Sequence, residues 1–240
     1  MSARDLVPFA LLVAVGGFVA VQVLGADDPV TPARANAIAE SRREALVASG
    51  HRRTVRALLA ERAPGTYIDA QLGADSMLLR WNRPPDRPVT VWIAPRSPVQ
   101  GWNPSHGDFA REAFVRWERE LPIRFAFVSD SASADVVVTW VAALPDVEQV
   151  GRSLRVYDQT GAIHRAEVEI AVRGRGGRDI PEGVARLIAL HEVGHALGLD
   201  HSPDPRDVMA ARYDGRGAGL TEADLATVRL LYSVPPGSYR

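Results

Sequence analysis

The residues best suited to chemistry lie close together in the last third of the sequence. His191, Glu192 and His195 form a His-Glu-x-x-His motif, which Gly198 and His201 extend. Histidines four residues apart project from one face of a helix, about one turn from each other, so that two imidazoles can share one cation. Glycine at 198 supplies the left-handed backbone that ends a helix without a Cβ penalty, which would let His201 return to the same point.

This set of donors predicts a catalytic Zn²⁺ ion. Neutral imidazoles from His191, His195 and His201 would leave the fourth position of a tetrahedral ion open to water, as in a catalytic rather than a structural site. Glu192 directly follows the first ligand. Its carboxylate is predicted to accept a proton from that water and to pass it to a leaving amine. Histidines that serve only the core or the surface would not explain this spacing.

The composition limits the other chemistry available to the chain. Its 240 residues contain no Cys, which excludes disulfides, thiolate nucleophiles, iron–sulfur clusters and Cys-ligated zinc. A net charge of −1 provides no concentrated positive surface, and we therefore expect no nucleic-acid partner. With 46% hydrophobic residues, the chain has enough apolar material for a large domain.

Predicted strands and helices alternate on both sides of the motif. Apolar alternation predicts three strands and a hairpin, at residues 89–94, 123–128, 135–140 and 152–172. The aromatic spacing of residues 108–120 predicts an amphipathic helix. Pro181 opens the helix that carries two of the histidines, and Asp179 can cap it. Together these elements predict an α+β fold in which helices pack on a mixed sheet.

The extended motif resembles that of the metzincin zinc endopeptidases, and more closely the matrixin (matrix metalloproteinase-like) family, including its bacterial members. The similarity continues outside the motif. It includes the segments 113–117, 123–127 and 134–138, the pair His201-Ser202, Met209 with Tyr213, and the segment 220–232, where Thr221 and Asp224 form a helix-capping pair. The resemblance covers residues 77–234.

The resemblance implies a fold and roles for particular residues. The expected fold is a metzincin-like catalytic domain with a twisted, mixed five-stranded sheet and three helices. Met209 would form the Met-turn beneath the zinc ion, and Tyr213 would form the wall of the S1′ pocket. Peptide would bind as an added antiparallel strand on the edge of the sheet. The substrate-binding residues on that edge strand would be Ser153, Leu154, Arg155, Val156 and Tyr157.

The chain departs from the family pattern at other metal and regulatory positions. Many matrixins keep their zinc site closed with a Cys thiolate, a latch that this chain cannot form. The carboxylate of Asp69 or Asp75 would be the alternative latch. The family's structural zinc site is missing from its usual place, so we expect His106 to be a surface residue and His164 to be structural. One catalytic Zn²⁺ ion is the expected cofactor, and no motif supports the calcium binding that the resemblance also allows.

The amino-terminal segment differs in character from the rest. Residues 6–24 carry no charge and, at about 1.5 Å per residue, are long enough to cross a bilayer as a helix. We expect residues 1–26 to be a signal anchor or signal peptide, residues 27–76 a helical linker or pro-like segment interrupted at Gly50, and residues 77–240 the catalytic domain. That domain would be membrane-anchored outside the cytoplasm, or secreted if residues 1–26 are cleaved.

The leading hypothesis is a membrane-tethered zinc endopeptidase that acts on a peptide or protein substrate, with water activated by Glu192. One alternative is a non-catalytic, zinc-stabilised, membrane-tethered protein-binding module. A base beside an open coordination position argues against that alternative, because a structural zinc ion has no use for it. A second alternative is a zinc hydrolase that acts on something other than peptides.

Overall fold

The structure is a computed structural model that describes residues 32–75, 77–146, 149–212 and 219–239. It contains two compact units, one ending at Arg52 and one spanning Arg53–Arg240, and all residues of the predicted site belong to the second. The expected anchor at residues 6–24 lies outside the described residues, and so does Tyr213. Within the described ranges, no helix is both long and apolar enough to cross a membrane.

The segment upstream of the expected catalytic domain is mostly helical. Helix α1 (Pro32–Arg62) runs without a break through Gly50, where the sequence predicted an interruption. That prediction was wrong because one glycine costs a helix only about 1 kcal/mol relative to alanine, too little to end a long helix. A second helix, α2 (Ile68–Asp75), follows a short turn.

The end of α1 and the start of α2 contribute to the hydrophobic core. Val55 and Leu59 of α1 are buried there, as are Tyr67 and Ile68 where α2 begins. The compact unit therefore begins at Arg53, upstream of the domain start at residue 77 that the sequence suggested.

The strands of this unit are short except in the hairpin. They are β1 (Met77–Leu78), β2 (Arg80–Trp81), β3 (Val89–Ile93), β4 (Phe125–Phe127), β5 (Val136–Val141), β6 (Gly151–Tyr157), β7 (Ala162–Ala171) and β8 (Gly237–Ser238). Two 3₁₀ turns also occur, η1 (Ser131–Ser133) and η2 (Arg175–Gly177). Strands β1 and β8 form a small antiparallel pair, and the other strands form the main sheet.

The main sheet contains the five strands that the sequence predicted and one short addition. Its order is β4, β3, β5, β7, β6, in which only β6 is antiparallel to its neighbour. The two-residue strand β2 pairs in parallel with the start of β7. Because β7 pairs with β5 on one side and with β6 on the other, β6 is an outer strand of the sheet.

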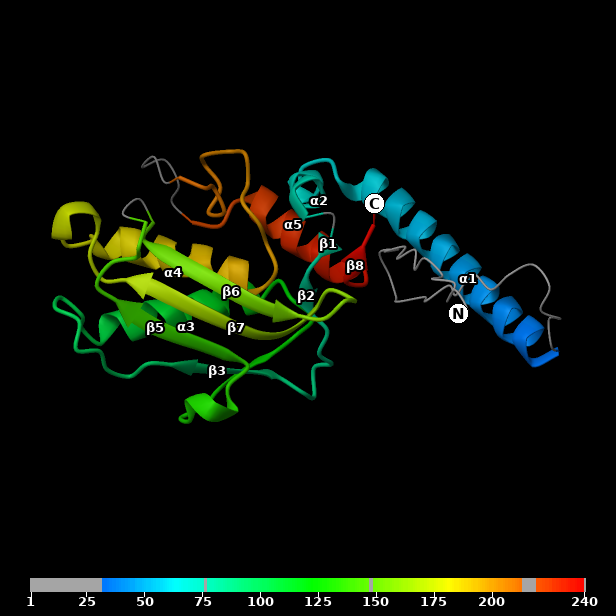
Figure 1. The fold of residues 1–240 in the computed structure, drawn as a ribbon. Coiled ribbons are helices and arrows are strands. Elements are labelled where there is room, and N and C mark those ends of the chain that lie inside the picture. The colour runs from blue at the N-terminus through cyan, green and yellow to red at the C-terminus, as the bar shows by residue number, and fades with distance from the viewer. Residues whose placement is uncertain (1–31, 76, 147–148, 213–218, 240) are drawn as a thin grey trace, which may run out of the picture. The chain divides into compact units, whose positions relative to one another are not determined.

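Besides α1 and α2, the described residues form three more α-helices. They are α3 (Ser105–Glu118), α4 (Glu182–Ala196) and α5 (Glu222–Ser233). Helices α3 and α4 lie behind the sheet in the view of Figure 1. Helix α4 begins directly after Pro181 without a side-chain cap, so the prediction that Asp179 caps it was wrong. The predicted capping pair of α5 is confirmed, because Thr221 and Asp224 form a reciprocal capping box.

Aromatic residues of α3 fix the position of α4. Phe109, Phe114 and Trp117 are buried on one face of α3, as the spacing predicted, although the helix begins earlier, at Ser105. The indole nitrogen of Trp117 donates a hydrogen bond of 2.9 Å to the carbonyl oxygen of Leu190. This bond fixes α4 at Leu190, the residue directly before the first candidate metal ligand, His191.

Candidate active site

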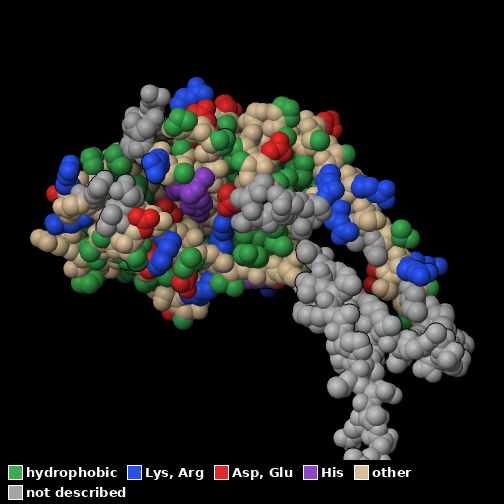
Figure 2. Space-filling view, turned by 45° about the horizontal axis from the view of Figure 1, so that its top comes forward, with side chains coloured by type: hydrophobic (Ala, Val, Ile, Leu, Met, Phe, Trp, Pro, Cys, Tyr) green, Lys and Arg blue, Asp and Glu red, His purple; other side chains and the backbone are tan. Residues whose placement is uncertain are grey.

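The three predicted ligands converge on one point. Their candidate donor atoms, on His191, His195 and His201, all lie within 4.8 Å of one another. A cluster of histidine side chains is visible on the face of the molecule shown in Figure 2. Gly198 makes the convergence possible, because its φ of 106° is a left-handed conformation and a Cβ there would lie 1.9 Å from the carbonyl oxygen of Leu79.

Backbone carbonyls fix the orientation of two of these rings. The Nδ1 atom of His191 lies 2.7 Å from the carbonyl oxygen of Val208, and Nδ1 of His195 lies 2.7 Å from that of Leu199. A carbonyl oxygen can only accept, so each Nδ1 carries the proton and each neutral ring has a free lone pair on Nε2.

The spacing of the free nitrogens fits a tetrahedral zinc ion. The Nε2 atoms of His195 and His201 are 3.2 Å apart. Two nitrogens bound to zinc at about 2.0–2.1 Å with a tetrahedral angle are separated by about 3.3 Å. The donor set and the geometry therefore both fit the group that the sequence predicted.

The surroundings keep the imidazoles neutral. Burial lowers the pKa of His191 and of His201, and burial together with the neighbouring His191 lowers the pKa of His195 further. The neutral ring is the form that binds a metal ion. The site is therefore prepared for a cation without first having to lose protons at neutral pH.

Glu192 is a buried carboxylate with one oxygen that lacks a partner. The residue is only 4% exposed, and no hydrogen-bond partner contacts its Oε2 atom within the described part of the chain. Burial raises the pKa of Glu192 to about 8. A divalent cation bound nearby would favour the charged form and lower this pKa. An unpaired polar atom of this kind is expected at a reactive site, where substrate or water supplies the missing partner.

Gly151, which the sequence did not single out, gives Glu192 its space. A Cβ at Gly151 would lie 2.1 Å from Oε1 of Glu192 and 2.5 Å from its Cγ and Cδ atoms. Strand β6 therefore begins directly against the carboxylate that the sequence assigned to proton transfer. The β-strand pattern gave no signal for this contact, because it depends on how α4 packs under β6.

Met209 is buried against α4. Its side chain is fully buried, and a Cβ at Gly194 would lie 2.4 Å from its sulfur. Its carbonyl oxygen accepts a 2.8 Å hydrogen bond from the backbone N–H of Ser202, directly after the third ligand. Met209 thus packs against α4 at Gly194, directly before His195, and its role as a Met-turn stays a prediction.

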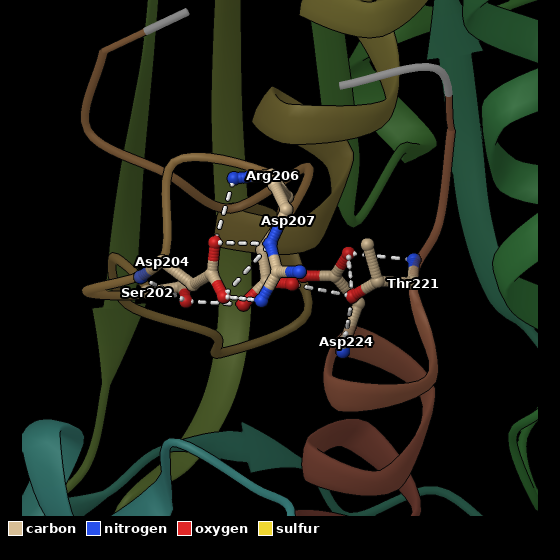
Figure 3. A network of polar contacts seen from close by, with 6 residues as sticks. All are labelled: Ser202, Asp204, Arg206, Asp207, Thr221 and Asp224. Atoms are coloured by element: carbon tan, nitrogen blue, oxygen red, sulfur yellow. Dashed lines mark hydrogen bonds and ion pairs between the residues drawn. The ribbon is translucent and has the colours of Figure 1, made fainter. Parts of the chain in front are cut away.

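The carboxylate of Asp224, drawn in Figure 3 beside Thr221, holds this turn in place through bonds to its backbone. Asp224 is fully buried, and its carboxylate accepts hydrogen bonds from the backbone N–H groups of Val208 (2.9 Å) and Met209 (3.3 Å). Thr221 bridges Asp224 to Asp207, donating a 2.6 Å hydrogen bond to the latter. The sequence predicted Asp224 as a helix cap, but its bonds to the turn join residues 15 and 16 positions apart and had no local signal.

A cleft of about 1080 Å³ lies over the ligands. Its lining includes the three histidines, Glu192, apolar residues of α4, and Gly151, Arg152, Ser153 and Arg155 from β6. Outer strand β6, on which the resemblance implied substrate binding, therefore borders the cleft. Tyr213, the other predicted substrate contact, cannot be placed because it lies outside the described residues.

The side chains of the predicted substrate strand face in two directions. Leu154, Val156 and Tyr157 are exposed, whereas Arg155 is turned inward. Its guanidinium forms a 3.0 Å ion pair with Asp200, the residue before His201. Arg155 therefore joins β6 to the ligand-bearing turn, a role that the sequence pattern did not indicate.

His164 and His106, which were not expected to bind the catalytic metal, lie outside the site. His164 contacts Asp158 at 2.7 Å, and Nδ1 of His106 contacts the backbone of Asn103 at the start of α3. Over the ranges that the structure describes, the three histidines of the cleft are the only group of three or more His, Cys, Asp or Glu residues arranged to hold a metal ion. Asp69, the suggested latch, is exposed and not part of that group.

Comparison with known proteins agrees with the sequence resemblance. Residues 86–233 match the model of the peptidase M10 family, described as matrixin. The chain is 31% identical over 144 residues to a probable matrix metalloproteinase, 095L, of Invertebrate iridescent virus 3, covering 52% of the chain and 37% of the relative. It is 44% identical over 182 residues to matrix metalloproteinase-15 of Homo sapiens, covering 66% and 26%. It is also 29% identical over 136 residues to metalloendoproteinase 1-MMP of Arabidopsis thaliana, covering 52% and 37%.

These matches extend over only part of each relative, since the chain spans between 26% and 37% of their lengths. The family match covers well over half of the chain and contains His191, His195, His201 and Met209. The histidine cluster is compatible with the catalytic zinc ion that matrixins bind through this motif. The chain therefore belongs to the matrixin family of zinc metallopeptidases.

Proposed function

We propose that this chain is a zinc-dependent endopeptidase that hydrolyses peptide bonds in a peptide or protein substrate. The observation that carries the proposal is the arrangement at the cleft. Three imidazoles converge on one point, two of them with a free Nε2 lone pair, and Glu192, whose buried Oε2 lacks a partner among the described residues, lines the same cleft. A site that only stabilised the fold would have no use for that carboxylate.

Each residue of the cleft has a role in this reaction. His191, His195 and His201 would hold a Zn²⁺ ion, which supplies Lewis acidity to the scissile carbonyl and to a water molecule. Glu192 accepts a proton from the attacking water through its unpartnered Oε2. The same carboxyl group then donates this proton to the nitrogen of the leaving amine, so the proton count balances.

Substrate is proposed to lie along β6 as an additional antiparallel strand. Support comes from the position of β6, which is an outer strand that borders the cleft. The backbone of residues 153–157 would provide most of the hydrogen bonds, as in other cases of strand addition. Leu154 and Val156 are exposed on this strand and would contribute apolar contact to a bound peptide.

The role of Glu192 is tested by Glu192→Gln, which keeps the shape of the side chain but removes the base. We expect full zinc content and a loss of turnover of about 10²–10⁴-fold, the usual contribution of general acid–base catalysis. Zinc content is measured by elemental analysis, and turnover with a quenched peptide library. The matched control is Glu182→Gln in the exposed first turn of the same helix, which should retain activity. Undiminished turnover of Glu192→Gln would refute the role.

The same assays separate both alternatives from the proposed endopeptidase. A protein-binding module would hold zinc and bind peptides without cleaving any member of the library. A hydrolase for other substrates would leave the library intact but lose its own reaction in Glu192→Gln.

We further propose that the apolar residues 6–24 tether the peptidase to a membrane, with the catalytic unit outside the cytoplasm. The support is the length of the run and its lack of charge. Cell fractionation should recover the full-length chain in membranes, with release by detergent but not by alkaline carbonate. A mature protein that lacks residues 1–26 and appears in the medium would instead identify a cleaved signal peptide.

A further inference from the structure

Two residues of the segment upstream of the matched family region, Tyr67 and Gln71, form hydrogen bonds to groups that support the candidate zinc ligands. Tyr67 and Gln71 lie in and just before α2, and they are 5% and 1% exposed. The family match begins only at residue 86. Both side chains use their polar groups on parts of the site that are distant in sequence, which ordinary core packing would not require.

Tyr67 contacts the support of His191. Its hydroxyl donates a 3.1 Å hydrogen bond to Oδ1 of Asp224, and burial raises the pKa of Tyr67, so the hydroxyl keeps its proton. Asp224 accepts the backbone N–H of Val208, whose carbonyl oxygen contacts Nδ1 of His191. Tyr67 is therefore three hydrogen bonds from the first ligand. Its own backbone N–H also donates to Oγ1 of Thr227 at 3.0 Å, which fixes the start of α2 against α5.

Gln71 contacts the support of the other two ligands. Its side-chain amide donates a 2.9 Å hydrogen bond to the carbonyl oxygen of Gly198, at the turn where α4 ends. The next residue, Leu199, accepts the Nδ1 proton of His195, and the chain reaches His201 two residues later. A buried amide placed on this turn limits its freedom to rotate.

We propose that residues 55–75 are an internal brace that holds the zinc site in its binding geometry, an inference that rests on the proposed zinc peptidase function. Within the described residues of α2, the cleft is lined by Ala70, whose methyl group leaves the ligands open. The hydroxyl of Tyr67 instead contacts Asp224, which holds the turn of Met209, and the amide of Gln71 contacts the carbonyl oxygen of Gly198. In this proposal the segment supports peptidase activity, whereas a pro-like segment, which the sequence also allowed, would inhibit it.

The brace acts on zinc affinity through the population of the competent site. Without it, the metal-free turns would sample arrangements in which the three imidazoles diverge. The apparent dissociation constant rises in inverse proportion to the fraction of molecules with the converged arrangement. Loss of one of these hydrogen bonds is therefore expected to weaken zinc binding about three- to tenfold.

The test uses two near-isosteric variants in the full chain. Tyr67→Phe removes only the hydroxyl, and Gln71→Met removes the donor while keeping an unbranched side chain of similar length. The zinc dissociation constant is measured by competition with a chromophoric chelator of known affinity, without any activity assay. We expect weaker binding by about three- to tenfold in each variant, and by about the product of the two factors in the double variant.

The matched control is Leu59→Ala, which removes buried packing of the same segment but none of its polar contacts to the site. It should lower the melting temperature of the metal-free protein and leave the zinc dissociation constant of the folded protein unchanged. The brace is refuted if Tyr67→Phe and Gln71→Met bind zinc as wild type does, or if either raises peptidase activity. A wild-type chain that binds no zinc would refute the proposed function itself.

Discussion

Among the described residues that line the cleft, two buried side-chain atoms lack a hydrogen-bond partner, Oε2 of Glu192 and Oγ of Ser153. Nδ1 of His191 and of His195 each have a carbonyl partner, which leaves Nε2 as the free atom of each ring. Oε2 of Glu192 is buried without a partner, at an energetic cost that folding elsewhere must offset. At the residue scale, reactivity therefore depends on which side-chain atoms lack a hydrogen-bond partner as much as on which residue types are present.

Gly151 is a position where one added methyl group should affect catalysis without affecting the ligands. Gly151→Ala would place Cβ within 2.5 Å of three side-chain atoms of Glu192, so the carboxylate must move. We expect normal zinc content and a fall in kcat of about a hundredfold, since a displacement of about 1 Å can have that effect. Gly183→Ala is the control. Gly183 lies on α4, the helix of Glu192, and an added Cβ there would have nothing within 4 Å. Wild-type kcat in Gly151→Ala would show that Glu192 has a second productive position.

At the scale of elements, strand β6 has two different sides. Its outer edge pairs with no strand among the described residues, and its inward side is joined to the turn before His201 through Arg155 and Asp200. The side chains of residues 153–157, which the resemblance grouped as substrate contacts, therefore have different surroundings. Because alternate residues of a strand face opposite sides, Arg155 cannot share the environment of Leu154 and Val156.

Sequence patterns predicted the elements that local rules govern. The helix of His191 and His195, the hairpin, the aromatic face of α3 and the capping box of α5 all follow from spacing within a few residues. The patterns did not predict the bond from Tyr67 to Asp224, which joins residues 157 positions apart. Such contacts depend on tertiary packing, which no local period encodes.

At the scale of the whole molecule, the site joins segments from most of the compact unit. Helix α4 supplies two ligands, the turn after it a third, and α5 and α2 hold the turns through Asp224 and Gln71. Zinc bound to the folded site would therefore be linked to the folding of the entire unit, because the unfolded chain does not bring these segments together.

This linkage predicts a melting temperature that depends on free zinc. Above the dissociation constant, each tenfold increase in free zinc adds about 1.4 kcal/mol of stability, which corresponds to about 3–6 °C for a domain of this size. Calorimetry over a series of zinc buffers measures this slope, and a chelator should return the protein to its metal-free melting temperature. His201→Ala is the control, because this exposed ligand can be removed without opening the core, and its slope should be much smaller. A wild-type melting temperature that stays constant over several decades of free zinc would mean that the folded chain holds no zinc at these histidines.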